Sequence, residues 1–442
     1  MSTIPQVSQA MQTVLTTAAE QADSKLHYTK RPDRAKFSAS TLVQTLVLGW
    51  LAHPDATVEQ LSQSAARVGV EASPQAIDQR FTFATAKLLQ SVLESSLEHS
   101  ISSDGVAIPI LQRFTAVRLH DGTTITLPKE LRQYWAGCGG RTEARTAAAL
   151  KCGVQFDLLS GELTALDLVS GRTHDGALPC QQAPLPAGSL RLADLGFYNL
   201  QRLAELQRAQ VYFLSKLRPT TTLSAPGLPF MQLASFVAEQ ASSGYDGWVV
   251  ISKQHQLSAR LLIEPVPQEV ADQRRRRIRR EAREKGQTAS ASALFLAAWT
   301  ILITNAPEEL LRVKEALILA RARWQIELLF KLWKSHGQID TWRTEKVERI
   351  LCEVYAKLLS MLLQHWMLVI GCWNYADKSL TKAAAVVRDH ACELASAQAR
   401  AERLSEVLET IQRVLKRTAR MNTRHKHPNT YQLLLALTTT DE

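Results

Sequence analysis

The chain has 442 residues, of which 45% are hydrophobic, so it is long enough for several domains with sizeable cores. This excludes disorder of the whole chain. Lysine and arginine number 52 against 42 acidic residues, and the net charge of +10 favours a polyanionic partner such as nucleic acid. The six cysteines show neither a C-x-x-C pair nor a zinc-ligand spacing, which favours a reducing compartment.

Two features argue against membrane insertion or export. The N-terminus lacks a basic region followed by an apolar core, so it does not resemble a signal peptide. The longest apolar run, residues 355–373, is interrupted by Lys357, Gln364 and His365. This run therefore predicts a buried helix and no membrane span.

Residues 38–100 have helical periodicity and predict a small helical domain. Thr57 and Gln60 form a capping-box pattern before one helix, and Ser73 with Pro74 opens the next. Two helices joined by a short turn fit a helix-turn-helix, whose second helix would present Gln75, Gln79 and Arg80 to DNA. An ordinary helical hairpin explains the same pattern.

Between residues 114 and 217 short β-rich runs replace the helical pattern. A first strand at 114–121 precedes a hairpin over 149–171, and then a strand, a helix from about Asn199 to Arg208 and a further strand follow. This order predicts a mixed α/β sheet.

Residues 218–290 are irregular, with strand-like pieces at 247–252 and 259–266. Residues 271–286 then carry seven arginines and one lysine against three acidic residues, a net charge of +5. A further strand at 297–305 precedes a long helical pattern from about Glu308 to Lys334. Residues 411–430 form a second basic segment, with six cations and no acid. Each basic segment is either a DNA contact or a solvated surface.

Asp121 and Asp194 come at or just beyond the ends of two predicted strands. Ligands and metals collect at strand ends in α/β sheets, although an aspartate there more often caps a turn. His174 and Asp175 follow the hairpin and allow the same two interpretations, with a turn favoured.

Arg323, Glu327 and Lys334 lie within about 40° of one another on the long predicted helix, whose other directions are apolar. Burying a carboxylate between two bases is costly unless something pairs with it. The pattern indicates either an Arg323 to Glu327 salt bridge or a metal-binding carboxylate flanked by phosphate-binding cations.

These residues match a known signature. The chain resembles the bacterial Asp-Asp-Glu transposases of the family named after insertion sequence four, whose third motif is Tyr-x-x-Arg-x-x-x-Glu-x-x-x-x-x-x-Lys. Arg323, Glu327 and Lys334 fit this motif within RWQIELLFKLWKS, while HDGTTITLP around Asp121 and ADLGFYNLQRL around Asp194 resemble the first two motifs. The similarity extends from about residue 40 to 436. The signature tyrosine is replaced by Ala320, which puts hairpin handling or full activity in question.

The resemblance implies an α/β fold with a ribonuclease-H-like mixed sheet core, an inserted, partly β domain, and helical N- and C-terminal domains. The corresponding boundaries are 1–105 for the helical N-terminal DNA-binding domain, 106–217 with 297–340 for the core, 218–296 for the insertion and 341–442 for the C-terminal domain. Asp121, Asp194 and Glu327 would bind two Mg²⁺ or Mn²⁺ ions and catalyse phosphodiester cleavage and strand transfer.

The resemblance also implies DNA contacts. Arg323 and Lys334 would hold phosphates, and Trp299 would stack on a base flipped out during hairpin formation, although a core tryptophan fits the pattern equally well. The basic insertion would bind the DNA backbone through Arg274, Arg275, Arg276, Arg277, Arg279 and Arg280, unless it is a solvated basic helix.

Two functions fit these sequence features. The first is a cut-and-paste transposase of the bacterial cytoplasm and nucleoid, which acts on the terminal inverted repeats of its element and on target DNA as a homodimer. The second is a transposition-defective protein that binds the ends as a repressor or a domesticated factor. A structure-selective nuclease with the same core is a weaker third interpretation. The presence of all three carboxylates favours the first.

Overall fold

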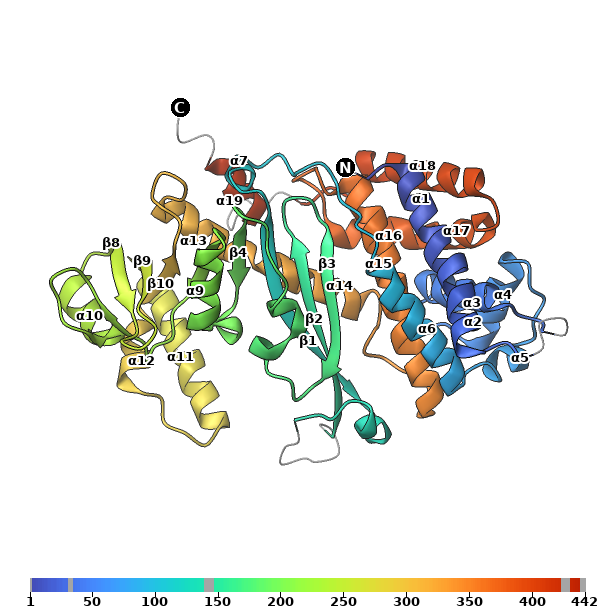
Figure 1. Ribbon diagram of the computed structural model, residues 1–442, viewed down its shortest axis with the longest axis horizontal. Coiled ribbons are helices and arrows are strands. Elements are labelled where there is room, and N and C mark those ends of the chain that lie inside the picture. The colour runs from blue at the N-terminus through green and yellow to red at the C-terminus, as the bar shows by residue number, and fades with distance from the viewer. Residues whose placement is uncertain (1, 31–34, 139–146, 423–429, 438–442) are drawn as a thin grey trace. The chain divides into compact units, whose positions relative to one another are not determined.

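The computed structural model describes residues 2–30, 35–138, 147–422 and 430–437 (Figure 1). The chain divides into two compact units. The first unit comprises Met1–Ala107, Gly122–Thr173 and Gln325–His425, and the second comprises Ile108–Asp121, His174–Trp324 and Lys426–Glu442. Strand β1, Val117–Leu127, contributes its first half to the second unit and its second half to the first.

The N-terminal part of the first unit is helical, as the periodicity predicts. Its helices are α1 (Ile4–Gln12), a π-helical turn (Thr13–Ala18), α2 (Ala19–Leu26), α3 (Ala39–Ala52), α4 (Val58–Arg67), α5 (Pro74–Asp78) and α6 (Phe83–Ser96). Thr57 and Gln60 form the predicted capping box of α4. Helix α3 is almost wholly buried, so it forms the centre of this helical layer.

The helix predicted to continue from Pro74 is interrupted. Helix α5 ends at Asp78, and α6 begins at Phe83 after a cap in which the Thr82 hydroxyl accepts a hydrogen bond from the Thr85 amide. Gln79 and Arg80 therefore lie in the turn between two helices. The expectation that one recognition helix presents Gln75, Gln79 and Arg80 is wrong in this respect, because the Thr82 cap starts a new helix.

The C-terminal part of the first unit packs around one long buried helix. It contains α14 (Trp324–Ser335), whose first residue belongs to the second unit, α15 (Val347–Cys372), α16 (Leu380–Asp389), α17 (Ala391–Ala397) and α18 (Ala401–Arg417). In the described part of the chain, α15 is the one helix long and apolar enough to cross a membrane, but its apolar window is entirely buried inside the protein. The prediction of a buried helix over 355–373 is confirmed.

The buried His365 on α15 predicts that the free energy of unfolding falls in mild acid. Burial lowers the pKa of His365 to about 4, so between about pH 4 and pH 6.5 the unfolded chain binds a proton that the folded chain does not. Stability is therefore complete above this window and decreases as the pH falls through it, by about 1 kcal/mol at about pH 5.5.

The measurement is urea unfolding at neutral and mildly acidic pH. The His365→Gln variant keeps a donor for the Gly161 carbonyl, which His365 Nε2 contacts at 2.7 Å, so it should lose less stability in acid than the wild type. Replacing the exposed His255 is the control. An equal pH dependence in the wild type and His365→Gln would contradict the prediction.

The first unit also contains the predicted hairpin. Strand β2 (Ala148–Asp157) pairs antiparallel with β3 (Leu163–Ser170) through the turn at Ser160 and Gly161. Gly161 has a φ of +76°, and a Cβ there would lie 2.6 Å from the Trp373 ring, so the turn requires glycine. A short 3₁₀ turn (Lys129–Gln133) follows β1.

The second unit is built on a mixed sheet. After α7 (Pro109–Gln112), its strands follow the order β1-β4-β5-β10-β9-β8-β6-β7, with β4 at Leu190–Ala193, β5 at Tyr212–Lys216 and β10 at Trp299–Thr304. Strands β1, β4 and β5 run parallel, and β10 is antiparallel to β5. Helix α9 (Leu200–Arg208) connects β4 with β5, close to its predicted position. The mixed α/β sheet predicted from residues 114–217 is confirmed.

Residues 218–296 extend this sheet beyond β10. They form β6 (Thr222–Ser224), β7 (Met231–Gln232), α10 (Leu233–Gln240), β8 (Tyr245–Ile251), β9 (Leu257–Pro265), α11 (Gln268–Glu284) and α12 (Ala291–Leu296). Phe236 of α10 and Ile263 of β9 share one hydrophobic core with Phe213 of β5 and Ile303 of β10. Helices α13 (Val313–Ala322) and α19 (Thr430–Ala436) complete the unit.

Candidate active site

Asp121 and Asp194 lie side by side on neighbouring parallel strands of the second unit. The last matched pair of β1 and β4 is His120 with Ala193, so the two aspartates occupy the next position in register. Neighbouring strands are about 4.8 Å apart, and residues in register point to the same face. Asp194 follows β4 directly, whereas Asp121 lies inside β1, because that strand continues to Leu127. The strand pairing therefore brings two carboxylates together.

Each aspartate has a basic neighbour. Arg323 Nη1 lies 3.1 Å from Asp121 Oδ2, and both side chains are less than one-fifth exposed. Lys216 Nζ lies 3.9 Å from Asp194 Oδ1 at an exposed site, where an ion pair contributes little to stability. Sequence reasoning missed Lys216. This residue ends β5, and the register of β4 and β5, continued by two positions, places it level with Asp194. Arg323 thus pairs with a residue of a strand.

Glu327 and Lys334 both lie on α14, in the first unit. The single helix expected from Glu308 to Lys334 is instead α13 followed by α14, with Arg323 at the junction. Seven residues, close to two turns, separate Glu327 from Lys334, so the predicted shared face holds for these two. Lys334 Nζ donates a hydrogen bond to the Thr124 carbonyl of β1 over 2.9 Å. Glu327 is half-buried and makes interactions of its own.

The donor set suits a hard divalent cation. Carboxylate oxygens are the ligands that Mg²⁺ and Mn²⁺ prefer, and a pair on adjacent strands can bind one ion together. Within the described ranges, no three histidine, cysteine, aspartate or glutamate side chains lie close enough together to form a metal site. A complete site thus needs a third ligand beside Asp121 and Asp194.

A buried polar layer lies behind the two aspartates. Because side chains alternate along a strand, Arg118 and His120 point away from the face that carries Asp121. The Gln181 amide nitrogen lies 3.0 Å from His120 Nδ1, and the Gln181 carbonyl accepts a hydrogen bond from Arg191. His120 Nδ1 is therefore the acceptor. Burial first, and then the charges of Arg191, Arg202 and Arg118, hold the pKa of His120 well below its usual value.

This buried layer, in which the histidine is neutral, holds β1 and β4 together on the face opposite the aspartates. Sequence reasoning did not identify it. The available signal was the alternation of polar and apolar residues in VRLH and LRLA, because polar residues at every second position of a buried strand require partners.

His174 and Asp175 lie next to the loop that carries Asp194. His174 Nδ1 accepts a hydrogen bond from the Gly176 amide, which confirms a turn role for this histidine. A Cβ at Gly196 would lie 2.7 Å from Asp175 Oδ2, so Asp175 contacts the 3₁₀ turn Leu195–Phe197 just after Asp194. A side chain at position 196 would displace this carboxylate.

Trp299 is the first residue of β10 and is half-buried. It packs against the core around Phe236, as expected for a core tryptophan, and the residue remains partly accessible. Arg274 donates to the Trp299 carbonyl over 2.8 Å and to the Thr300 hydroxyl over 3.2 Å. Helix α11 is therefore tied to the strand that begins with Trp299.

The arginines predicted to bind DNA differ in their environment. Arg274 and Arg275 are half-buried and hold backbone carbonyls, so their first role is structural. Arg277 and Arg280 pair with glutamates one turn later on α11. Arg276 and Arg279 are exposed and have no ion pair in the described part of the chain. Of the six predicted arginines, these two are best placed to bind phosphate, and Arg283 of the same helix is also exposed.

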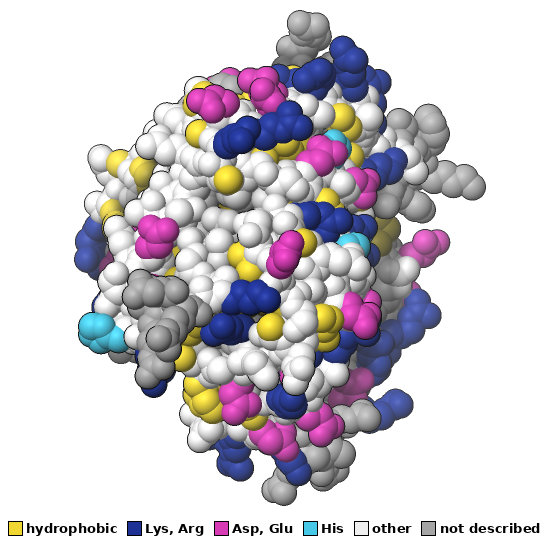
Figure 2. All heavy atoms as spheres, turned by 90° about the vertical axis from the view of Figure 1, so that its right-hand side faces the viewer, with side chains coloured by type: hydrophobic (Ala, Val, Ile, Leu, Met, Phe, Trp, Pro, Cys, Tyr) yellow, Lys and Arg dark blue, Asp and Glu magenta, His cyan; other side chains and the backbone are white. Residues whose placement is uncertain are grey.

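The other proposed DNA-reading segments are less distinctive. On the face of the first unit in Figure 2, lysines and arginines alternate with acidic side chains, so charge alone marks no DNA surface there. Asp78 of α5 pairs with Lys346 and Arg349. In the second basic segment, residues 423–429 lie outside the described residues.

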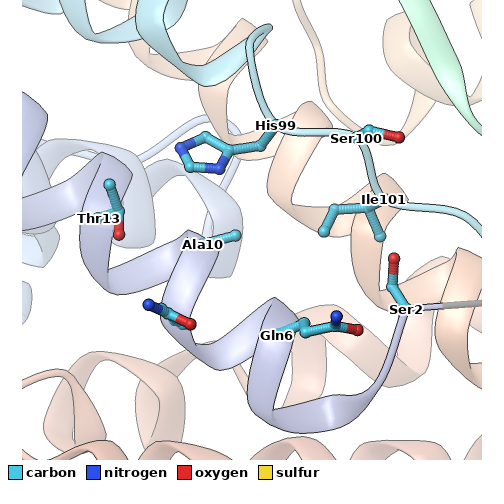
Figure 3. Close-up of a pocket in the computed structure, with 8 residues that line it drawn as sticks. Ser2, Gln6, Ala10, Thr13, His99, Ser100 and Ile101 are labelled. Atoms are coloured by element: carbon cyan, nitrogen blue, oxygen red, sulfur yellow. The ribbon is translucent and has the colours of Figure 1, made fainter.

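The first unit contains a pocket of about 310 Å³ between α1 and residues 99–101 (Figure 3). Serine, glutamine and threonine side chains and His99 line it, and His99 packs edge-on against Trp366 at 6.0 Å. Its described lining contains no carboxylate. The pocket therefore offers no carboxylate ligand and is distinct from the aspartate site.

Comparison with known proteins decides the family. Residues 112–363 match the model of the transposase DDE domain, and this span contains Asp121, Asp194 and Glu327. The chain belongs to the DDE transposases. It is 24% identical to the transposase of insertion sequence element IS231B from Bacillus thuringiensis subsp. berliner, over 94% of this chain and 91% of the relative.

Other relatives agree. The chain is 25% identical to the transposase of IS1151 from Clostridium perfringens, over 70% of each protein. It is 27% identical to a putative transposase of IS186A from Escherichia coli, over 56% of this chain and 64% of the relative. As a DDE transposase, the chain is an enzyme that acts on DNA, and such domains generally use divalent metal ions. The mixed sheet with its many helices is compatible with a ribonuclease-H-like core.

Proposed function

We propose that this DDE transposase cuts its element from DNA and joins it to a target, with Asp121, Asp194 and Glu327 as the metal ligands. The adjacent placement of Asp121 and Asp194 on parallel strands is the observation that carries the proposal. Glu327 supplies the third carboxylate from α14. The strands and connecting helix around the aspartates support a ribonuclease-H-like core, and the Arg-Glu-Lys spacing supports membership of the family named after insertion sequence four.

Two Mg²⁺ or Mn²⁺ ions held by these carboxylates would supply a polarised attacking oxygen and a stabilised leaving oxygen for in-line displacement. The protein positions the DNA around them. Arg323 binds a phosphate with its planar guanidinium and orients Asp121, which it contacts at 3.1 Å. Lys334, held at β1 by the Thr124 carbonyl, adds a positive charge for a neighbouring phosphate.

Strand transfer follows from cleavage in this proposal. Water attack at the element end gives a 3′-hydroxyl, which attacks the opposite strand to form a hairpin and, after reopening, attacks the target. Trp299, a partly accessible residue at the start of β10, stacks on a base flipped out of the hairpin. The enzyme works as a homodimer on two terminal inverted repeats in the bacterial cytoplasm, at the nucleoid.

Helix α11 contributes phosphate contacts through Arg276 and Arg279. Replacing both by glutamine should lower the slope of log K against log salt for duplex DNA by about 2, because each phosphate contact contributes about 0.9. Fluorescence anisotropy over a salt series measures this slope. The control is Arg208→Gln with Lys314→Gln, two exposed cations of the same unit. Equal slopes for both double variants would contradict a special role for α11.

The proposed function is tested by cleavage of DNA that carries the ends of the chain's own element. Incubation with Mg²⁺ or Mn²⁺ should give nicks at the ends and hairpin products, and chelation should abolish both. Tight end binding without cleavage would instead support the alternative, a transposition-defective repressor or domesticated binding protein. Ala320→Tyr is then the informative variant, because it restores the signature tyrosine that this chain lacks.

A further inference from the structure

Two large aromatic rings lie stacked on the surface of the first unit. Phe83, the first residue of α6, and Tyr134, which follows the 3₁₀ turn after β1, have ring centroids 6.1 Å apart and planes inclined by 26°. Phe83 is 41% exposed and Tyr134 is 43% exposed. Leaving two adjacent aromatic rings in water is unfavourable, so the arrangement suggests a ligand that covers them.

Buried neighbouring residues hold the two aromatic rings in place. Tyr134 is followed by the buried Trp135, whose ring packs at 6.1 Å against Tyr355 of α15. The Tyr355 hydroxyl donates a hydrogen bond to Gln90 of α6, the helix that begins with Phe83. Because both rings are anchored to the same helix pair, little conformational freedom is lost when a ligand stacks on them.

Cations flank the rings. Lys87 is one helical turn after Phe83 on α6, and Arg132 precedes Tyr134 by two residues. Both side chains are exposed, and neither forms an ion pair within the described ranges. Two exposed cations without ion pairs beside stacked aromatic rings indicate a ligand with both phosphates and planar rings.

We propose that Phe83 and Tyr134 form a stacking platform for unpaired DNA bases, with Lys87 and Arg132 binding the adjacent phosphates. Base stacking on aromatic side chains together with backbone contacts to basic residues is the general mode of binding single-stranded DNA. This inference rests on the action of the chain on DNA. Strands separated at a cleaved or distorted element end are the ligand that the site would hold.

The test is binding of a fluorescent oligothymidylate of about 20 nucleotides, measured without metal by anisotropy. In Phe83→Leu/Tyr134→Leu the apolar bulk remains but the rings are lost, so Kd should rise about tenfold or more. Tyr134→Phe keeps the ring and should bind like the wild type. Tyr375→Leu removes an exposed ring elsewhere in the same unit and is the matched control.

Two further measurements identify the contacts. Lys87→Gln/Arg132→Gln should lower the salt slope for the oligothymidylate by about 1.4, since each phosphate contributes about 0.7 on single strands. Photo-crosslinking of an oligonucleotide that carries 5-iododeoxyuridine should attach the base at Tyr134 or Phe83, as mapped by mass spectrometry.

Wild-type affinity for the oligothymidylate in the double leucine variant would overturn the proposal. If the wild type forms a dimer that dissociates in this variant while the oligothymidylate affinity is unchanged, the rings bind a second protein chain, and the proposal is also overturned. If the double variant fails to fold, Tyr134→Leu alone decides, because its ring is on the surface. The assay needs neither metal nor the element ends, so stacking without cleavage would reject the proposed catalysis and leave the platform intact.

Discussion

The Glu327→Gln variant should cleave element ends at least about a thousandfold more slowly than the wild type and should bind the same DNA equally well. Glutamine keeps the size of the side chain and removes its negative charge, so α14 keeps its packing while the third metal ligand is weakened. The measurement is single-turnover cleavage of end-labelled DNA with Mn²⁺, alongside anisotropy with the same duplex.

Two further variants are compared with Glu327→Gln. Glu345→Gln changes an exposed glutamate in the loop after α14 and should cleave at the wild-type rate. Asp121→Asn should be as inactive as Glu327→Gln, because both would ligate the same ions. Cleavage by Glu327→Gln within about tenfold of the wild-type rate would contradict the assignment of Glu327 as a ligand.

The Lys357→Met variant should lose about 3–5 kcal/mol of unfolding free energy. Lys357 on α15 is 2% exposed, and its ammonium group pairs with the equally buried Glu353 at 3.2 Å. It also donates to the Gln338 and Thr341 carbonyls in the loop that follows α14. Removing the ammonium group leaves a buried carboxylate undercompensated and two carbonyls without this donor.

Urea unfolding measures this loss. Lys346→Met, which removes an exposed pair with Asp78, is the control and should change stability by less than about 1 kcal/mol. Glu353→Gln/Lys357→Met should recover part of the loss, since it also removes the buried negative charge. A Lys357→Met protein as stable as the wild type would show that the loop after α14 is held by other contacts.

Local patterns predicted most elements of the sheet. The hairpin around Gly161 and the strand before Asp194 are formed where expected, because strand periodicity and turn residues are short-range signals. The strand expected over 114–121 is formed but runs from Val117 to Leu127, so Asp121 lies inside it. Their partners could not be predicted. The parallel register that places Asp121 beside Asp194 joins segments more than seventy residues apart in the sequence.

The incorrect predictions concern helix ends, and the functional residues that were missed are buried polar groups. Periodicity extended one helix through Arg323 and another through Arg80, although the Arg323 side chain pairs with Asp121 and Thr82 caps a new helix. The Thr82 cap is a local signal that the helical periodicity hid, whereas the Arg323 pair is a tertiary contact that sequence patterns do not assign. For the same reason, the family motif identified Glu327 but gave no indication of Gln181, whose role exists only beside His120 and Arg191.

The central claim is that Asp121, Asp194 and Glu327 hold the same metal ions, and iron-mediated backbone cleavage tests it most directly. Fe²⁺ bound at a Mg²⁺ site generates hydroxyl radicals that cut the nearest polypeptide segments, and the fragments can be mapped by mass spectrometry. We expect cuts near residues 121, 194 and 327, all suppressed by excess Mg²⁺ and by Asp121→Asn. Cuts near both aspartates without any near residue 327 would contradict it.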